Sequence, residues 1–423
     1  MDWPLSAKWR WKAIYATARS AITETPNNRT TAMGDAADLK SNWNFPTQVL
    51  FGPGRIASLP AGCRSLGMAR PLLVTDPGLA ALPMIAEALE LCRADGLGVA
   101  LFSEVKGNPT GANVEAGIAA FKAGGHDGVI AFGGGSALDA GKTIAFVARQ
   151  SRHWSEFEDR GTNWKLADPE AIAPILAVPT TAGTGSETGR VGVILDERDH
   201  IKKIVFHPKM LPGLVISDPE LTVGLPAKLT AATGMDALAH CLEAYCAPGF
   251  QPLCEGIAVE GMRLIKDWLP RAVHEGQDVE ARAYMLAAAS MGSTAFQKGL
   301  GAIHSLSHPV GALYDTHHGL TNAVFMPYVL QFNRTAIEAK MQRLAAWLGL
   351  GTPGFPAFLD WVLRFREELG IPHSLAEIGV DDSRTDEIVA MALDDPTAPT
   401  NPVPLEAAPV RRLFEDALAG RLA

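Results

Sequence analysis

Hydrophobic and polar positions follow different patterns in the two halves of the chain. Between residues 42 and 218, short apolar runs rich in β-branched residues alternate with stretches whose apolar residues recur every three or four positions. The first kind predicts buried strands and the second predicts helices. The predicted strands are Pro71–Thr75, Gly98–Phe102, Gly128–Phe132, Ile175–Val178 and Leu214–Ile216. This alternation favours a parallel sheet covered on both faces, with ligands outside the carboxyl ends of the strands.

Helical spacing dominates after about Pro219, where the β-rich runs disappear. The predicted helices are Pro226–Ala247, Cys254–Trp268, Val279–Phe296, His304–Leu313, Thr335–Leu348 and Phe355–Leu369, with a last one from about Glu406 after a tail rich in Pro and Asp at Asp394–Leu405. A chain of 423 residues is longer than a domain built around one hydrophobic core usually is. The sequence therefore predicts an α/β domain over residues 42–218 and an all-helical domain over residues 219–423.

The first 41 residues differ from the rest. Met1–Ala32 carries five basic residues, two acidic residues and three tryptophans, and it lacks the apolar core of a secretion signal. We interpret residues 1–41 as an extension that is either disordered or not part of the natural protein, with Met33 as the expected start. A weak targeting segment and a short helix around Trp9–Ala21 remain alternatives.

Composition and charge argue against several kinds of partner. The net charge is −9, which repels a phosphate backbone and disfavours nucleic acid. No window reaches about 18 uninterrupted apolar residues, so no membrane span is predicted. The five cysteines form no C-x-x-C pair, which favours buried thiols in a reducing compartment. We therefore expect a cytoplasmic protein.

A glycine-rich turn follows the predicted strand Gly128–Phe132. Gly133, Gly134, Gly135 and Ser136 precede a helical stretch at Ala137–Ala148. Glycines let backbone N–H groups approach a phosphate, and a helix N-terminus favours an anion. These four residues are therefore candidates for holding a pyrophosphate. The alternative is a tight turn without a ligand.

Two further segments lie where a dinucleotide could bind. Asp76 ends a predicted strand, and its carboxylate could bind adenosine ribose hydroxyls while repelling a 2′-phosphate, which favours NAD over NADP. The alternative for Asp76 is an N-cap before Pro77. The loop Thr180–Ser186 offers hydroxyls after another strand, with a solvated loop as its alternative.

Four histidines and one aspartate stand at helical spacing or in a nearby turn. They are Asp236, His240, His304, His308 and His318, and His317 is the one rival for the place of His318. Residues four apart share a helix face and can hold one ion. One carboxylate with imidazoles suits Fe(II) or Zn(II), which act as Lewis acids on an alcohol or carbonyl oxygen. The alternative is a set of separate core histidines and a helix cap.

Ordered motifs from Asn42 to the end resemble the iron-containing (group III) alcohol dehydrogenase family. They are Phe51–Gly54, Val74–Asp76, Asn108–Thr110, Gly133–Lys142, Pro179–Glu187, Ser217–Leu221, Gly234–His240, His304-x3-His308-Pro309 and His318-Gly-x2-Asn322-Ala323. The stretch Arg152–Lys165 carries no clear motif of the family. It either forms a surface loop or lines the substrate entrance.

The resemblance implies the dehydroquinate synthase-like fold of this family, with the active site between the α/β and helical domains. It implies that the metal ligands are Asp236, His240, His304 and His318. It implies a proton-relay role for His308 near the substrate and nicotinamide. The implied cofactor residues are Asp76, Asn108, Gly133, Gly134, Gly135, Ser136, Asp139, Thr180, Thr181, Thr184 and Lys202, with Lys203 as an alternative to Lys202.

The implied function is a metal-dependent, NAD-linked alcohol dehydrogenase or aldehyde reductase acting on a small alcohol, diol or hydroxy acid. Relatives with this architecture suggest a homodimer or larger homo-oligomer. Two enzymatic alternatives are a hydroxyacid–oxoacid transhydrogenase and a maleylacetate reductase-like activity. A third alternative is a non-catalytic nucleotide-binding protein with a structural metal, which the lack of cysteine ligands disfavours.

Overall fold

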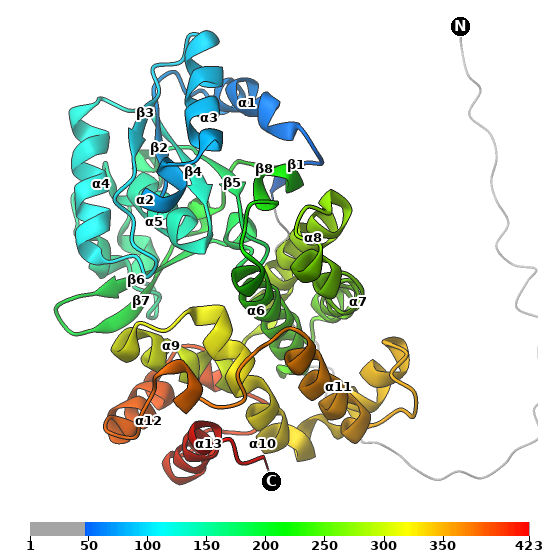
Figure 1. Ribbon diagram of the computed structural model, residues 1–423. Helices are drawn as coiled ribbons and strands as arrows, with labels where there is room; N and C mark the ends of the chain where they lie inside the picture. The colour runs from blue at the N-terminus through cyan, green and yellow to red at the C-terminus, as the bar shows by residue number, and fades with distance from the viewer. Residues whose placement is uncertain (1–46, 423) are drawn as a thin grey trace, which may run out of the picture. The chain divides into compact units, whose positions relative to one another are not determined.

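The computed structural model describes residues 47–422, so the extension at residues 1–41 and its suggested helix lie outside the described residues. Six parallel strands form one sheet in the order β1-β8-β5-β4-β2-β3 (Figure 1). The strands are β1 (Gln48–Phe51), β2 (Pro71–Val74), β3 (Ala100–Phe102), β4 (Gly128–Gly133), β5 (Ile175–Pro179) and β8 (Leu214–Ser217). The parallel sheet and its five predicted strands are confirmed. Strand β1 was not predicted, because it is a four-residue edge strand without a buried run.

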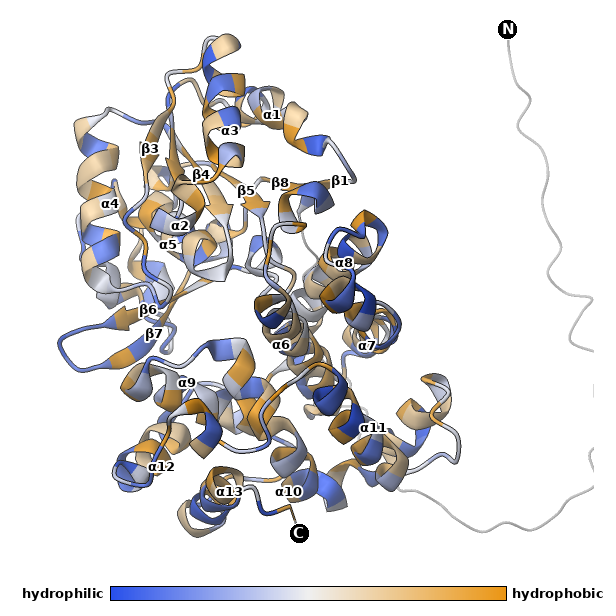
Figure 2. Ribbon diagram, viewed as in Figure 1, coloured by the Kyte–Doolittle hydropathy of each residue, from blue (hydrophilic) through white to orange (hydrophobic). Residues whose placement is uncertain are grey.

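Helices cover both faces of this sheet. They are α1 (Leu59–Ser65), α2 (Pro77–Ala80), α3 (Pro83–Ala94), α4 (Gly111–Ala123) and α5 (Gly135–Val147). Successive side chains of a strand point to opposite faces. In β4, Val129 and Ala131 belong to the core that includes α4 and α5, whereas Ile130 and Phe132 belong to the core that includes α1 and α3. Strand β4 is accordingly apolar along its length, as Figure 2 shows.

A two-stranded antiparallel hairpin, β6 (Val191–Asp196) and β7 (Ile201–Phe206), stands apart from the main sheet. It was not predicted, because Lys202 and Lys203 interrupt the apolar run of β7. The stretch Arg152–Lys165 packs beside it: Glu158 bridges Val205 of β7, and Trp154 is buried. This stretch is therefore partly core and not a free surface loop.

Helices dominate the described chain after β8. They are α6 (Ala227–Cys246), α7 (Pro252–His274), α8 (Val279–Ala295), α9 (Ala302–Tyr314), α10 (His318–Trp347), α11 (Phe355–Glu368), α12 (Thr385–Asp394) and α13 (Ala407–Ala419). The prediction that α10 begins at Thr335 was wrong, and α12 was not predicted. Residues 321–330 of α10 are all buried, so no polar face marks that half as a helix. No helix among residues 47–422 is both long and apolar enough to cross a membrane.

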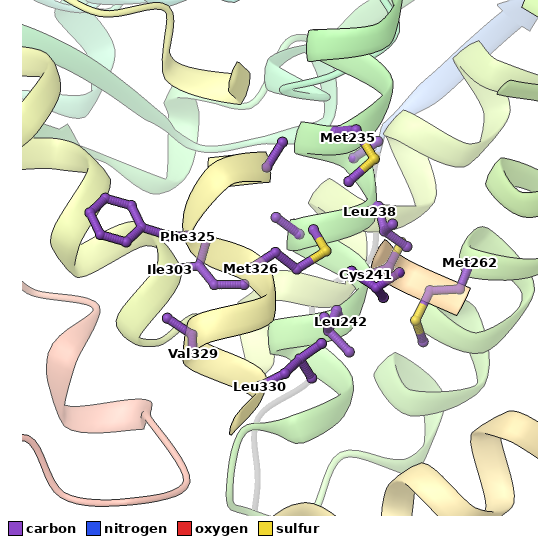
Figure 3. Packing of buried hydrophobic residues seen from close by; sticks show 14 of the residues in the cluster. Met235, Leu238, Cys241, Leu242, Met262, Ile303, Phe325, Met326, Val329 and Leu330 are labelled. Atoms are coloured by element: carbon purple, nitrogen blue, oxygen red, sulfur yellow. The ribbon is translucent and has the colours of Figure 1, made fainter. Parts of the chain in front are cut away.

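The apolar core of the helical half holds three helices in fixed relation. Figure 3 shows Leu238 and Leu242 of α6 beside Met326 and Leu330 of α10, with Ile303 of α9 packed into the same cluster. Interiors of this kind are close-packed and resist displacement of one helix against another. The polar side chains that α6, α9 and α10 present elsewhere are therefore held at defined separations.

Candidate metal centre and cofactor cavity

The four side chains predicted as metal ligands come together from three helices. Asp236 and His240 lie one turn apart on α6, His304 lies on α9, and His318 begins α10. The Asp236 Oδ1 atom is 3.9 Å from His240 Nε2, 4.0 Å from His304 Nε2 and 3.7 Å from His318 Nε2. Ligand atoms around one tetrahedral transition-metal ion lie about 3.4 Å apart. The ligand atoms of Asp236, His304 and His318 all lie within 4.8 Å of one another, so a small contraction would bring these three onto one ion. His240 is near Asp236 but lies outside this group of three.

Burial keeps two of these imidazoles in the form that binds metals. It lowers the pKa of His240 to about 4 and lowers the pKa of His318 well below its ordinary value. Both rings are therefore neutral at pH 7, and a neutral imidazole nitrogen carries the lone pair that a metal needs. The donor types and the neutral form of these two imidazoles fit a divalent metal ion.

The first turn of α10 approaches α6 closely because Gly319 has no side chain. A Cβ at Gly319 would lie 2.4 Å from the Ala232 carbonyl oxygen and 2.9 Å from Asp236 Cβ. One turn further along α10, buried Asn322 places its Nδ2 atom 2.8 Å from Asp236 Oδ1 and 3.1 Å from His318 Nε2. The same Nδ2 atom lies 3.2 Å from His304 Nε2, so Asn322 contacts three of the predicted ligands and helps to orient them.

Two carboxylates bind the histidines of α9 from other elements. Glu243 of α6 lies with its Oε2 atom 2.5 Å from His304 Nδ1. Asp395, just after α12, lies with its Oδ2 atom 2.8 Å from His308 Nδ1. Burial alone would lower the pKa of His304, but Glu243 raises it above its ordinary value. Each imidazole thus has its Nδ1 atom fixed by a carboxylate on another element.

The glycine turn between β4 and α5 meets the threonine loop that follows β5. Gly133 has φ 146°, a conformation that favours glycine. A Cβ at Gly135 would lie 2.5 Å from Thr184 Cγ2, and one at Gly134 would lie 3.3 Å from Thr181 Cγ2. The two predicted loops are therefore packed together at the carboxyl ends of neighbouring strands, where open α/β sheets bind ligands.

The structure distinguishes between the two candidate lysines of β7. Lys202 donates from Nζ to Asn108 Oδ1 at 3.0 Å, whereas Lys203 pairs with Asp196 at 2.6 Å. Burial lowers the pKa of Lys202 to about 8, and nearby Asp315 opposes the shift. Lys202 and Asn108 therefore lie in contact, and both line the cavity described below.

One cavity of about 470 Å³ is lined by residues of both halves of the described chain. From the α/β half it includes Asn108, Gly135, Ser136, Asp139, Thr184 and Lys202, and Asp159 of the stretch without a motif. From the helical half it includes His240, His304, His308 and His318. Part of the predicted metal set and part of the predicted cofactor set thus line one cavity.

Other predicted residues do not line this cavity. They are Asp76, Gly133, Gly134, Thr180, Thr181 and Asp236. The Asp76 carboxylate caps α2 by accepting from Leu79 N at 3.0 Å, which was the alternative role. Asp139 lines the cavity, but it also accepts from Val193 N at 3.0 Å and so ties α5 to the hairpin.

Comparison with known proteins identifies the family. The model of the iron-containing alcohol dehydrogenase family matches residues 46–219, and the model of the C-terminal part of that family matches residues 230–418. The chain belongs to the iron-containing alcohol dehydrogenase family. It is accordingly an oxidoreductase that acts on CH–OH groups.

Several family members are similar over nearly their full length. A 4-hydroxybutyrate dehydrogenase of Cupriavidus necator is 41% identical over 388 residues, covering 88% of this chain and 99% of the relative. An NAD-dependent methanol dehydrogenase of Bacillus methanolicus is 34% identical, covering 89% of this chain and 100% of the relative. A crystal structure of 1,3-propanediol oxidoreductase superposes with a TM-score of 0.85 at 34% identity. The match covers 89% of this chain and 99% of that structure's chain.

Sequence reasoning missed two carboxylates, Glu243 and Asp395, that contact residues of the candidate site. Glu243 follows His240 by three positions and Asp236 by seven, so helical spacing alone could have placed it on the same face. Asp395 is 87 residues from His308 and carries no local signal. The Pro- and Asp-rich tail that contains Asp395 was noted only for its composition.

Proposed function

We propose that this family member is a metal-dependent, NAD-linked alcohol dehydrogenase or aldehyde reductase for a small alcohol, diol or hydroxy acid. One observation carries the proposal: His304 and His318 line the same cavity as Gly135 and Ser136. In this proposal residues 42–218 form the cofactor-binding domain and residues 219–423 form the metal-binding domain.

Asp236, His240, His304 and His318 would hold Fe(II) or Zn(II), since both ions accept one carboxylate with three imidazoles. Such a cation, when bound, supplies Lewis-acid chemistry to the oxygen of an alcohol or carbonyl group. The protein contributes a buried and preorganised donor set, because Asp236, His240 and His304 are each at most 5% exposed.

His308 is proposed to move a proton at Nε2. Its Nδ1 atom is engaged with Asp395, and its side chain lines the cavity. This arrangement fixes the ring and leaves one nitrogen facing the space where substrate and water would lie. A positioned imidazole of this kind is an ordinary general acid or base.

The cofactor is proposed to be NAD(H), which exchanges the hydride. Gly133, Gly134, Gly135, Ser136 and Asp139 would surround its pyrophosphate, where the N-terminus of α5 favours an anion. The further contacts are proposed at Asp76, Asn108, Thr180, Thr181, Thr184 and Lys202. The cavity contacts of Asn108, Thr184 and Lys202 support this assignment.

The substrate is proposed to carry a primary hydroxyl at the end of a short chain. The similar proteins are named for 4-hydroxybutyrate, methanol and 1,3-propanediol, which share that group. A panel of these three compounds and their aldehydes, assayed with NAD(H) and NADP(H), tests the proposal on protein of measured metal content. We expect turnover that chelation abolishes and that Fe(II) or Zn(II) restores. Undiminished turnover by metal-free protein would reject it, and turnover without added NAD would favour the transhydrogenase.

Replacing Gly135 with alanine is expected to weaken cofactor binding selectively. The new Cβ would lie 2.5 Å from Thr184 Cγ2, so the turn proposed to hold the pyrophosphate must shift. We expect the Kd for NADH to rise about 10- to 100-fold, equivalent to ~1.4–2.8 kcal/mol. Fluorescence titration with NADH measures this, with G256A as the matched control because Gly256 on α7 is exposed and has no atom near its Cβ. An unchanged Kd in G135A would contradict the assignment of the turn.

A further inference from the structure

Glu243 lies between the two helices that carry most of the predicted ligands. It stands on α6, on the same face as Asp236 and His240, and is 6% exposed. Its Oε2 atom is 2.5 Å from His304 Nδ1, and its Oε1 atom accepts from Ile303 N at 2.7 Å. One carboxylate therefore binds both the side chain of a predicted ligand and the backbone at the start of α9.

We propose that Glu243 is a positioning residue that sets how tightly the site retains its metal. This inference rests on the proposed metal centre. Glu243 acts through His304: by accepting a hydrogen bond from Nδ1–H, it fixes the tautomer in which Nε2 keeps its lone pair. A carboxylate on the far nitrogen of an imidazole also makes the ligating nitrogen a stronger donor.

The bond to Ile303 N adds a geometric constraint. The first N–H groups of a helix have no partner within the helix, and a carboxylate there is favourable. Because Glu243 binds the first turn of α9 and the His304 ring together, it fixes the ring relative to its own helix. The same residue ties that helix to α6, which carries Asp236.

Glu243 differs from Asp395 in the histidine that it binds. Within residues 47–422, His304 is the one predicted ligand with a carboxylate hydrogen-bonded to Nδ1, and His318 Nδ1 is buried without a hydrogen-bond partner. Asp395 makes the corresponding bond to His308, which is not a predicted ligand. Removal of the Glu243 charge should therefore act mainly through His304, the predicted ligand to which Glu243 is hydrogen-bonded.

Zinc retention by wild type, E243Q and E243A tests the proposal in the full chain. Glutamine keeps the size and one acceptor oxygen but removes the charge, whereas alanine removes both. We expect chelator competition to show zinc affinity about 10- to 100-fold weaker in E243Q, and weaker again in E243A. E255Q is the control, because Glu255 is a partly buried carboxylate of α7 that pairs with Lys298 and Lys340, each at 3.1 Å, and makes no ion pair with a predicted ligand.

The outcomes separate a positioning role from a structural one. Thermal unfolding of the metal-free proteins is measured in parallel, and E243Q should lose zinc affinity beyond any loss seen in E255Q. Equal zinc affinity in wild type and E243Q, or an equal loss in E255Q, would overturn the proposal. If E243A fails to fold, E243Q alone decides. Wild-type protein that binds no zinc or iron would overturn the metal centre as well, whereas bound zinc without alcohol turnover would overturn only the proposed reaction.

Discussion

Replacement of His318 by alanine is expected to remove both the bound metal and the activity. The same replacement at His317 should leave metal content and activity unchanged. The two histidines are neighbours, yet His318 Nε2 lies 3.7 Å from Asp236 Oδ1 and His317 Nδ1 accepts from Leu320 N at 3.3 Å. Loss of Lewis-acid stabilisation worth several kcal/mol lowers kcat by roughly 10²- to 10⁴-fold. Loss of a helix cap lowers the free energy of unfolding by about 1 kcal/mol.

Metal analysis and steady-state kinetics on the two variants measure this difference. H317A serves as the control for removing an imidazole at the start of α10. An H318A protein with full metal content and wild-type turnover would show that the ligand set is wrongly assigned. Loss of metal in H317A, with H318A unaffected, would exchange the roles of the two residues.

Replacement of His308 by alanine is expected to lower kcat by about 10²- to 10⁴-fold while the metal stays bound. His308 and His304 lie one turn apart on α9, but their Nδ1 atoms contact different carboxylates, Asp395 and Glu243. The expected loss is that of a general acid or base, because His308 lines the cavity without being a predicted ligand. D395N should produce a smaller loss of about tenfold, since asparagine still accepts a hydrogen bond but carries no charge.

The test pairs kcat with metal content for H308A, D395N and H304A. H304A supplies the comparison, because it should lose metal together with turnover. If H308A also released the metal, His308 would be a ligand and not a proton relay. If D395N retained wild-type kcat, Asp395 would have no part in orienting the ring.

Much of the fold followed from local pattern. Buried apolar runs such as Gly128–Phe132 predicted the central strands, because a strand covered on both faces needs apolar residues at every position. The prediction of where α10 begins was wrong for a related reason. Residues 321–330 are buried all round, so the polar face that normally marks a helix is missing. The β6–β7 hairpin was not predicted because two charged residues, Lys202 and Lys203, lie within β7.

The candidate site was likewise predicted in part from the sequence and in part only revealed by the structure. Helical spacing on α6 predicted that Asp236 and His240 share a face, and the geometry agrees. Spacing could not decide between His317 and His318, because they are adjacent in the sequence. Only the path of the chain into α10 determines which of the two side chains points toward Asp236. The structure directs His318 to Asp236 and uses His317 as a helix cap. It likewise separates Lys202, beside Asn108, from Lys203, beside Asp196.

The sequence by itself determined which side chains could bind a metal or a phosphate, since residue type and helical spacing are local properties of the chain. Only the tertiary structure decided which of them meet, because contacts between elements depend on how three helices pack. Glu243 reaching His304 and Asp395 reaching His308 are contacts of that second kind, joining residues 61 and 87 positions apart.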